Sequence, residues 1–169
     1  FKICLPAVAD EADRVASPVQ AAGDAARGAE TVLLVEDAPR VREVVREILE
    51  MNGYRVIEAR HGQDAIELSQ RHTGPIQLMV TDVVMPQMSG IEACRQIKAI
   101  DRFRDTPIIM VTVKTDPVDL QLAFAAGAMD YVAKPVNKIE LLTRVRSVLR
   151  LVHEIDRRRA REQELLEVM

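Results

Sequence analysis

One stretch of the sequence decides the fold: Leu78-Met79-Val80-Thr81-Asp82-Val83-Val84-Met85-Pro86. A mostly apolar run ends at a single carboxylate, Asp82, and a loop closed by Pro86 and Gly90 follows. This order predicts a buried strand, a loop and then a helix, so Asp82 should lie at the carboxyl edge of a sheet. Ligands of open α/β folds bind at that edge, which makes Asp82 the first candidate functional residue.

Further apolar segments, each followed by a helical pattern, flank this stretch. The expected strands are 32–35, 54–58, 76–81, 107–111 and 129–133, and the helices begin at Pro39, Gly62, Gly90, Asp116-Pro117 and near Asn137. In the fourth helix, the spacing predicts that Leu120, Ala123 and Phe124 face inward. Such repeated units need crossover connections, which give a parallel sheet. We therefore expect an α/β fold with a doubly wound, flavodoxin-like sheet of five parallel strands and an extended C-terminal helix.

The composition is that of a globular domain and argues against several classes of function. The chain has 169 residues, is 48% hydrophobic and 29% charged, and carries a net charge of -3. Aromatic residues make up only 3% and no basic run is interleaved with them, so nucleic-acid binding is not expected. No apolar run approaches the length of a membrane span. Cys4 and Cys94 show neither a disulfide nor a metal-ligand pattern, which favours a reducing, cytoplasmic location.

Polar residues end four of the predicted strands and should meet at one edge of the sheet. They are Glu36 and Asp37, Asp82, Thr112 and Lys134. Clustered carboxylates repel one another unless a cation lies among them, and Mg²⁺ prefers such oxygen ligands. Asp82 is a candidate nucleophile that could form an acyl phosphate. The chain has no Gly-rich nucleotide-binding loop, so the phosphoryl donor must be supplied by another molecule or domain.

These motifs, in this order, resemble the receiver domain of two-component response regulators. The matching pieces are Val-Leu-Leu-Val-Glu36-Asp37, Met-Val-Thr-Asp82-Val-Val-Met-Pro86-Gln-Met-Ser-Gly90, Pro-Ile-Ile-Met-Val-Thr112 and Asp-Tyr131-Val-Ala-Lys134-Pro135, within residues 31–150. The resemblance implies that Asp82 takes a phosphoryl group from a phosphohistidine on a kinase or phosphotransfer domain, with Mg²⁺ held by Glu36, Asp37 and Asp82.

The resemblance also implies a conformational switch. Thr112 and Lys134 would stabilise the phosphorylated state, and Tyr131 would turn inward as Thr112 moves toward the phosphate. The only reactions implied are self-phosphorylation and autodephosphorylation. One departure concerns access to Asp82: the residue after the switch threonine is usually very small in this family, and here it is Val113. We expect Val113 to slow both the entry of the phosphoryl donor and the attack of water, with Val84 as the second residue that limits access.

The two ends suggest a larger protein. Residues 1–8 resemble the closing strand of a histidine-kinase ATP-binding domain, and residues 9–30 are expected to form a flexible linker. The receiver domain would span 31–153, and 154–169 would be a helical stalk toward a further module. This layout is that of a hybrid histidine kinase. In the last helix, apolar residues at Leu141, Val145, Val148, Val152, Ile155 and Leu166 fit a heptad repeat that predicts a homodimer through this helix.

Two other functions remain open on the sequence. The chain could be a degenerate receiver that acts only as a dimerisation or docking module, although its complete set of acidic residues argues against this. It could also be a phosphatase with an aspartyl intermediate. That chemistry usually needs a second acid two residues after the nucleophile, where this chain has Val84. Any one of the acids alone would be explained by helix capping, so the functional interpretation depends on their combination.

Overall fold

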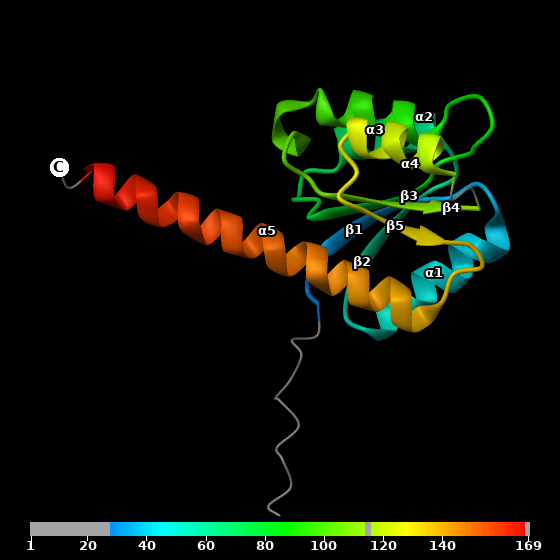
Figure 1. The fold of residues 1–169 in the computed structure, drawn as a ribbon, viewed down its shortest axis with the longest axis horizontal. Helices are drawn as coiled ribbons and strands as arrows, with labels where there is room; N and C mark the ends of the chain where they lie inside the picture. Colours follow the sequence, from blue (N-terminus) through cyan, green and yellow to red (C-terminus); the bar gives the residue numbers. More distant parts are fainter. Residues whose placement is uncertain (1–27, 114–115, 168–169) are drawn as a thin grey trace, which may run out of the picture.

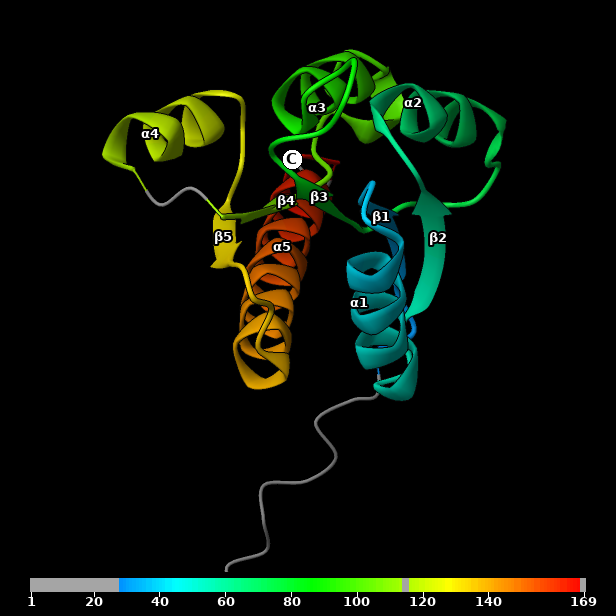
Figure 2. The same ribbon diagram turned by 90° about the vertical axis from the view of Figure 1, so that its right-hand side faces the viewer.

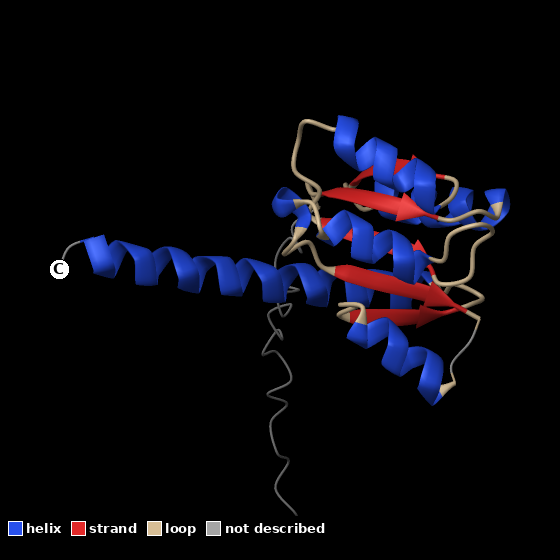
Figure 3. Ribbon diagram, turned by 90° about the horizontal axis from the view of Figure 1, so that it is seen from above, coloured by secondary structure: helices blue, strands red, loops and turns tan. Residues whose placement is uncertain are grey.

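The computed structural model describes residues 28–113 and 116–167, and it confirms the predicted fold class (Figure 1). A single sheet of five parallel strands has the order β2-β1-β3-β4-β5. The arrows of the strands point the same way, so all carboxyl ends lie on one edge (Figure 3). The strands are β1 (Thr31–Val35), β2 (Arg55–Ala59), β3 (Leu78–Asp82), β4 (Ile108–Thr112) and β5 (Asp130–Ala133).

Helices cover both faces of the sheet in three layers (Figure 2). Helices α1 and α5 lie on one face, and α2, α3 and α4 lie on the other. This arrangement follows from the crossovers that join parallel strands. The helices are α1 (Pro39–Met51), α2 (Gly62–Arg71), α3 (Gly90–Lys98), α4 (Pro117–Ala125) and α5 (Lys138–Glu167), with a short 3₁₀ helix η1 (Asp101–Phe103) after α3.

The sheet separates two hydrophobic cores, and β1 shows how. Val32 and Leu34 belong to the core under α1 and α5, whereas Leu33 and Val35 belong to the core under α2 and α3. Successive side chains of a strand point to opposite faces, so a strand covered on both faces is apolar at every position. This explains the uninterrupted apolar runs in the sequence.

The structure corrects the predicted inward face of α4. Ala123 is buried and Leu120 is partly buried, but Phe124 is 45% exposed. Helix α4 packs near the edge strand β5, so only a narrow stripe of it contacts the core. The ring of Phe124 instead makes a T-shaped contact with the ring of Tyr131, with the two centroids 6.5 Å apart and the ring planes at 81°. The turn formed by η1 was also not predicted, because its three residues carry no periodic pattern.

Helix α5 is the longest element and extends well beyond the sheet (Figures 1 and 3). It begins after Asn137, whose Oδ1 accepts hydrogen bonds from the N–H groups of Ile139 and Glu140. Leu141 and Val145 are fully buried, whereas every residue of 153–167 is exposed. Within 28–113 and 116–167, no helix has the length and apolarity needed to cross a membrane. The segments predicted upstream, 1–8 and most of 9–30, lie outside the described residues.

Candidate functional site

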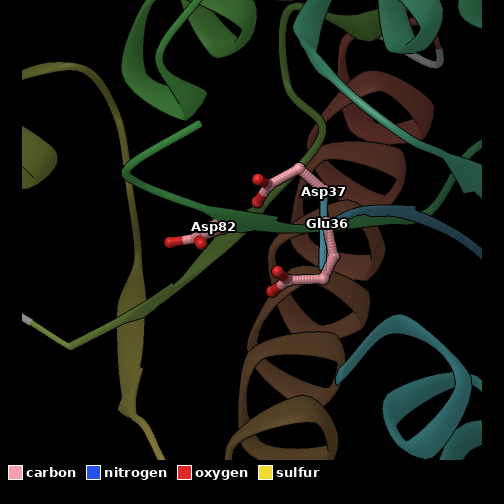
Figure 4. A group of neighbouring side chains, drawn as sticks. All are labelled: Glu36, Asp37 and Asp82. Atoms are coloured by element: carbon pink, nitrogen blue, oxygen red, sulfur yellow. The ribbon is translucent and has the colours of Figure 1, made fainter. Parts of the chain in front are cut away.

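Three carboxylates meet at the carboxyl ends of the neighbouring strands β1 and β3. Glu36 and Asp37 follow β1, and Asp82 is the last residue of β3. These strands are neighbours, with Val35 paired to Thr81, so their ends bring the three side chains together (Figure 4). One oxygen from each carboxylate lies within 4.8 Å of the others. The oxygens of this cluster are the donor type that Mg²⁺ prefers, so the residues present fit that ion.

Glu36 is the most deeply placed of the three acids, with only 1% of its surface exposed. Its Oε1 accepts a hydrogen bond from the N–H of Ala38 at 3.1 Å. Burial disfavours the charged carboxylate and raises the pKa of Glu36, and the nearby charge of Asp82 acts in the same direction. The hydrogen bond and charge of Lys134 and the Ala38 N–H oppose this shift without cancelling it. A nearby cation therefore favours the ionised form of Glu36.

Lys134 supplies that cation from the end of β5. Its Nζ lies 2.8 Å from Oε2 of Glu36 and 2.7 Å from Oδ2 of Asp82. Burial lowers the pKa of Lys134, but the hydrogen bonds and charges of the two acids outweigh burial, and the net pKa is raised. The backbone N–H of Lys134 donates to the carbonyl oxygen of Thr112 at 2.9 Å, which fixes the loop beside β4. The Lys134–Pro135 peptide bond is cis.

The backbone on either side of Asp82 fixes the direction of its carboxylate. Oδ1 of Asp82 accepts a hydrogen bond from the N–H of Val84 at 3.1 Å, while Oδ2 faces Lys134. The start of α3 packs closely behind: a Cβ added to Gly90 would lie 1.8 Å from the carbonyl oxygen of Asp82. The sequence placed Gly90 at the close of the loop after Asp82 and at the start of the third helix. Its close approach to the backbone of Asp82 was not predicted.

Thr112 lies on β4, the strand next to that of Asp82, and Tyr131 lies on β5, the edge strand beyond it. Thr112 is the last residue of β4 and is buried. The residue before it, Val111, pairs with Asp82. Tyr131 is partly buried on β5. A small cavity of about 10 Å³ is lined by both residues together with Val83, Met110, Asp119, Leu120 and Ala123. The structure thus places the two predicted switch residues around one space.

The structure adds a contact to Tyr131 that the sequence did not signal. The guanidinium of Arg144, from α5, lies 5.5 Å from the centre of the Tyr131 ring. Nη1 of Arg144 also lies 2.7 Å from Oδ1 of Asp130, and this hydrogen bond is the largest cause of the raised pKa of Arg144. Tyr131 is therefore held between Phe124 of α4 and Arg144 of α5.

The two residues predicted to limit access are both on the surface. Val113 is 68% exposed directly after Thr112, and Val84 is 51% exposed two residues after Asp82. Neither side chain is part of the hydrophobic core. Their positions in the chain place them on the loops that leave the carboxyl ends of β4 and β3.

Comparison with known proteins assigns the family. A family model described as the response regulator receiver domain matches residues 32–146. The chain belongs to this family. The receiver domain therefore accounts for all five strands and for the first part of α5, and the rest of α5 extends beyond it.

Relatives with longer chains share the receiver domain. The transcriptional regulatory protein CpxR of Escherichia coli is 38% identical over 122 residues, which cover 72% of this chain and 50% of CpxR. A probable cyclic di-GMP phosphodiesterase of Vibrio cholerae is 40% identical over 70% of this chain and 26% of its own length. The chain thus spans about half the length of the first curated relatives that it matches.

Solved structures agree with this assignment. The chemotaxis protein CheY4 of Vibrio cholerae has a TM-score of 0.67 and 32% identity, covering 70% of this chain and 98% of CheY4. The receiver domain of the sensor histidine kinase PA1611 of Pseudomonas aeruginosa has a TM-score of 0.65 and 31% identity, covering 71% of this chain and 97% of that domain. The PA1611 domain has a magnesium ion coordinated in its active-site cleft.

Proposed function

We propose that this receiver domain accepts a phosphoryl group on Asp82 from a phosphohistidine of a kinase or phosphotransfer domain. One observation carries the proposal: Asp82 is a buried carboxylate whose two oxygens are held by the Val84 N–H and the Lys134 ammonium, beside Glu36 and Asp37. A carboxylate fixed in this way is positioned as a nucleophile. A docking module that is never phosphorylated would not need three acids at this edge.

The reaction exchanges one bond to phosphorus for another. An Asp82 oxygen attacks the phosphorus, the bond between phosphorus and the histidine nitrogen breaks, and that nitrogen keeps the electron pair. Phosphoryl transfer of this kind needs positioning and charge stabilisation more than covalent help from the protein. Glu36, Asp37 and Asp82 would hold Mg²⁺, which when bound neutralises charge on the phosphoryl oxygens. Lys134 adds a positive charge on the other side of Asp82.

Phosphorylation of Asp82 would change the positions of Thr112 and Tyr131. A new phosphoryl group on Asp82 offers acceptor oxygens that Lys134 and the Thr112 hydroxyl can bind. We infer that Thr112 then moves toward Asp82 and Tyr131 turns into the space it leaves, which alters the surface formed by α4, β5 and α5. Phosphorylation would thus shift an equilibrium between two arrangements of this surface.

The wider context is also a proposal. Two structural neighbours are described as receiver domains of histidine kinases, which supports a hybrid kinase as the parent protein. In that layout, residues 1–8 would close a kinase domain, 9–30 would link it to the receiver at 31–153, and 154–169 would lead to a further module. The donor histidine could lie on the same polypeptide or on another one.

Mass spectrometry tests the phosphorylation directly. The full chain is incubated with Mg²⁺ and acetyl phosphate, and its intact mass is compared with that of Asp82→Asn and of the surface control Asp101→Asn. We expect a gain of about 80 Da in the wild type and in Asp101→Asn only, removed by hydroxylamine as an acyl phosphate should be. If a phosphorylated histidine donor also leaves the wild-type mass unchanged, the proposal fails and the docking module becomes the better explanation.

A further inference from the structure

The exposed part of α5 is a long helix without a covering partner in the part of the chain that the structure describes. Residues 153–167, here called the α5 extension, are exposed throughout and include Ile155, Leu165 and Leu166. The last two are 67% and 72% exposed. An isolated helix of this length is marginal in water, and most helical stability comes from packing of an apolar face. The extension therefore needs a surface to pack against.

A heptad repeat continues from the domain into this extension. The positions that face the core, Leu141, Val145 and Val148, are followed at the same spacing by Val152, Ile155, Arg159, Glu162 and Leu166. In heptad terms, Val152, Arg159 and Leu166 occupy a positions, and Ile155 and Glu162 occupy d positions. The a and d positions form the contact face of a coiled coil, here called the seam. In this chain the seam contains one cation, Arg159, and one anion, Glu162, between apolar residues. These two charges decide which pairing of helices is favourable.

We propose that the α5 extension pairs with the same segment of a second copy of this chain in antiparallel orientation. In an antiparallel pair, a positions face d positions of the other helix. In one register, Arg159 of each copy faces Glu162 of the other copy. In the same register, Ile155 of each copy faces Leu166 of the other copy. Every one of these contacts joins opposite charges or two apolar side chains.

Other pairings lose this complementarity. A parallel, in-register pair would stack Arg159 on Arg159 and Glu162 on Glu162, and like charges in contact are destabilising. The antiparallel pair can also be shifted by one heptad in either direction. One shift places Ile155 against Arg159 of the other copy, and the opposite shift places Glu162 against Leu166 of the other copy. The wider charge pattern agrees, because the basic run from Arg157 to Arg161 precedes Glu162, Glu164 and Glu167. An antiparallel copy reverses this order and sets basic residues near acidic ones.

The surroundings of the extension allow a second helix to lie along it. A cavity of about 360 Å³ opens beside Val152, at the end of the sheet opposite Asp82. Its lining is mixed: Ile76, Pro107 and Leu149 are apolar like Val152, and the other residues are polar or charged, among them Arg102, Asp105 and Asp156. In the proposed register, the last turn of the second helix, with its Leu166, would lie beside this cavity and close to Val152. Arg159 also contacts Asp105 of its own chain at 3.3 Å, but both side chains are well exposed, and such ion pairs contribute little.

Disulfide trapping tests the orientation. The full chain, with Cys4→Ser and Cys94→Ala, carries either Ile155→Cys or Leu166→Cys, and the two variants are oxidised separately and as a mixture. We expect cross-linked dimers in the mixture and almost none in either variant alone. In the proposed register, residue 155 of one copy would lie about 16 Å from residue 155 of the other copy, measured along the helix axis. This distance is beyond the reach of a disulfide.

A matched control uses the outer face of the same helix. Arg157→Cys and Glu164→Cys lie opposite one another along the axis in the proposed register but point away from the seam, so their mixture should not cross-link. Cross-linking of Ile155→Cys with itself would show a parallel pair and overturn the proposal. Cross-linking of the 155 and 166 mixture that is no greater than in the outer-face control would also overturn it.

A charge exchange provides a second measurement without cysteines. Sedimentation equilibrium should show dimer formation weakened about tenfold by Arg159→Glu or by Glu162→Arg, and restored by the double exchange. A parallel pair would not show this rescue, because its like-charged layers remain in every variant. Both experiments omit Mg²⁺ and any phosphoryl donor. Their outcome is therefore independent of whether Asp82 is phosphorylated, and their failure would leave the proposed function untouched.

Discussion

The Nζ atom of Lys134 lies 2.7 Å from Oδ2 of Asp82, on the oxygen that does not face the Val84 N–H. The same ammonium lies 2.8 Å from Glu36. Lys134 therefore neutralises two of the three carboxylates that would hold Mg²⁺, and the lysine and the metal ion compete for the same oxygens. This competition leads to the first prediction.

Lys134→Met should bind Mg²⁺ more tightly than the wild type. Removal of one positive charge from beside the cluster should strengthen binding on the order of tenfold, or ~1.4 kcal/mol. Calorimetric titration with MgCl₂ measures the affinity. Lys98→Met, which removes a lysine of α3, serves as the control and should leave the affinity unchanged. Equal affinity in wild type and Lys134→Met would show that Lys134 does not oppose the metal.

Gly90→Ala should destabilise the fold. An added Cβ would lie 1.8 Å from the Asp82 carbonyl oxygen, so backbone atoms must move. We expect a loss of about 1–3 kcal/mol in the free energy of unfolding, measured by urea denaturation. Gly74→Ala is the matched control, because its Cβ would meet only the flexible side chain of His72 at 3.0 Å. Similar losses in both variants would contradict the proposed clash.

Cys94 should make stability depend on pH above pH 9. Burial raises the pKa of its thiol from 9.0 to about 12, so the unfolded chain releases this proton first. The contribution of Cys94 is fully present below pH 9 and is lost as pH rises toward 12. Relative to Cys94→Ala, the free energy of unfolding of the wild type should fall by about 1 kcal/mol between pH 9 and pH 10. A difference independent of pH would exclude a buried, protonated thiol.

Val113→Ala should speed both the phosphorylation of Asp82 by acetyl phosphate and the hydrolysis of the acyl phosphate. The side chain is exposed, so its truncation should change stability by less than about 0.5 kcal/mol while removing bulk near the site. Time-resolved intact mass measures both rates, and several-fold increases are expected. Val44→Ala, an exposed valine on α1, is the control. Unchanged rates would show that Val113 does not limit access.

Phosphorylation should reduce the exposure of Tyr131. The chain has two tyrosines and no tryptophan, so a Tyr54→Phe variant leaves Tyr131 as the single emitter. If Tyr131 turns inward, acrylamide should quench its fluorescence less after phosphorylation than before. Adding Asp82→Asn to the same variant should abolish the change. Equal quenching before and after phosphorylation would rule out an inward turn of this ring.

Much of the fold and of the site followed from local patterns. The apolar runs of β1 and β3 reflect burial on both faces, and the end of each strand places Glu36, Asp37 and Asp82 at one edge. The position of Lys134 followed in the same way, because β5 ends directly before it. These features depend on periodicity and chain order, which a sequence displays directly.

Features that depend on the distance between elements were not predicted. The inward placement of Phe124 was wrong, because its exposure is set by how far α4 overlaps the edge of the sheet. The contact of Arg144 with Tyr131 joins α5 to β5 and leaves no local signature in the sequence. The same is true of the approach of Gly90 to Asp82, which depends on how α3 packs behind its strand.

Helix α5 is continuous from Leu141 and Val145, which are buried against the sheet, to Glu167. The distance from Val145 to Glu167 is about 33 Å at 1.5 Å per residue, and the structure shows no break in the helix. A tilt of the helix base by only about 5° would move its tip by about 3 Å over that length. Helix α5 thus has the form of a lever, with its fulcrum in the hydrophobic core and its Arg144 beside the ring of Tyr131.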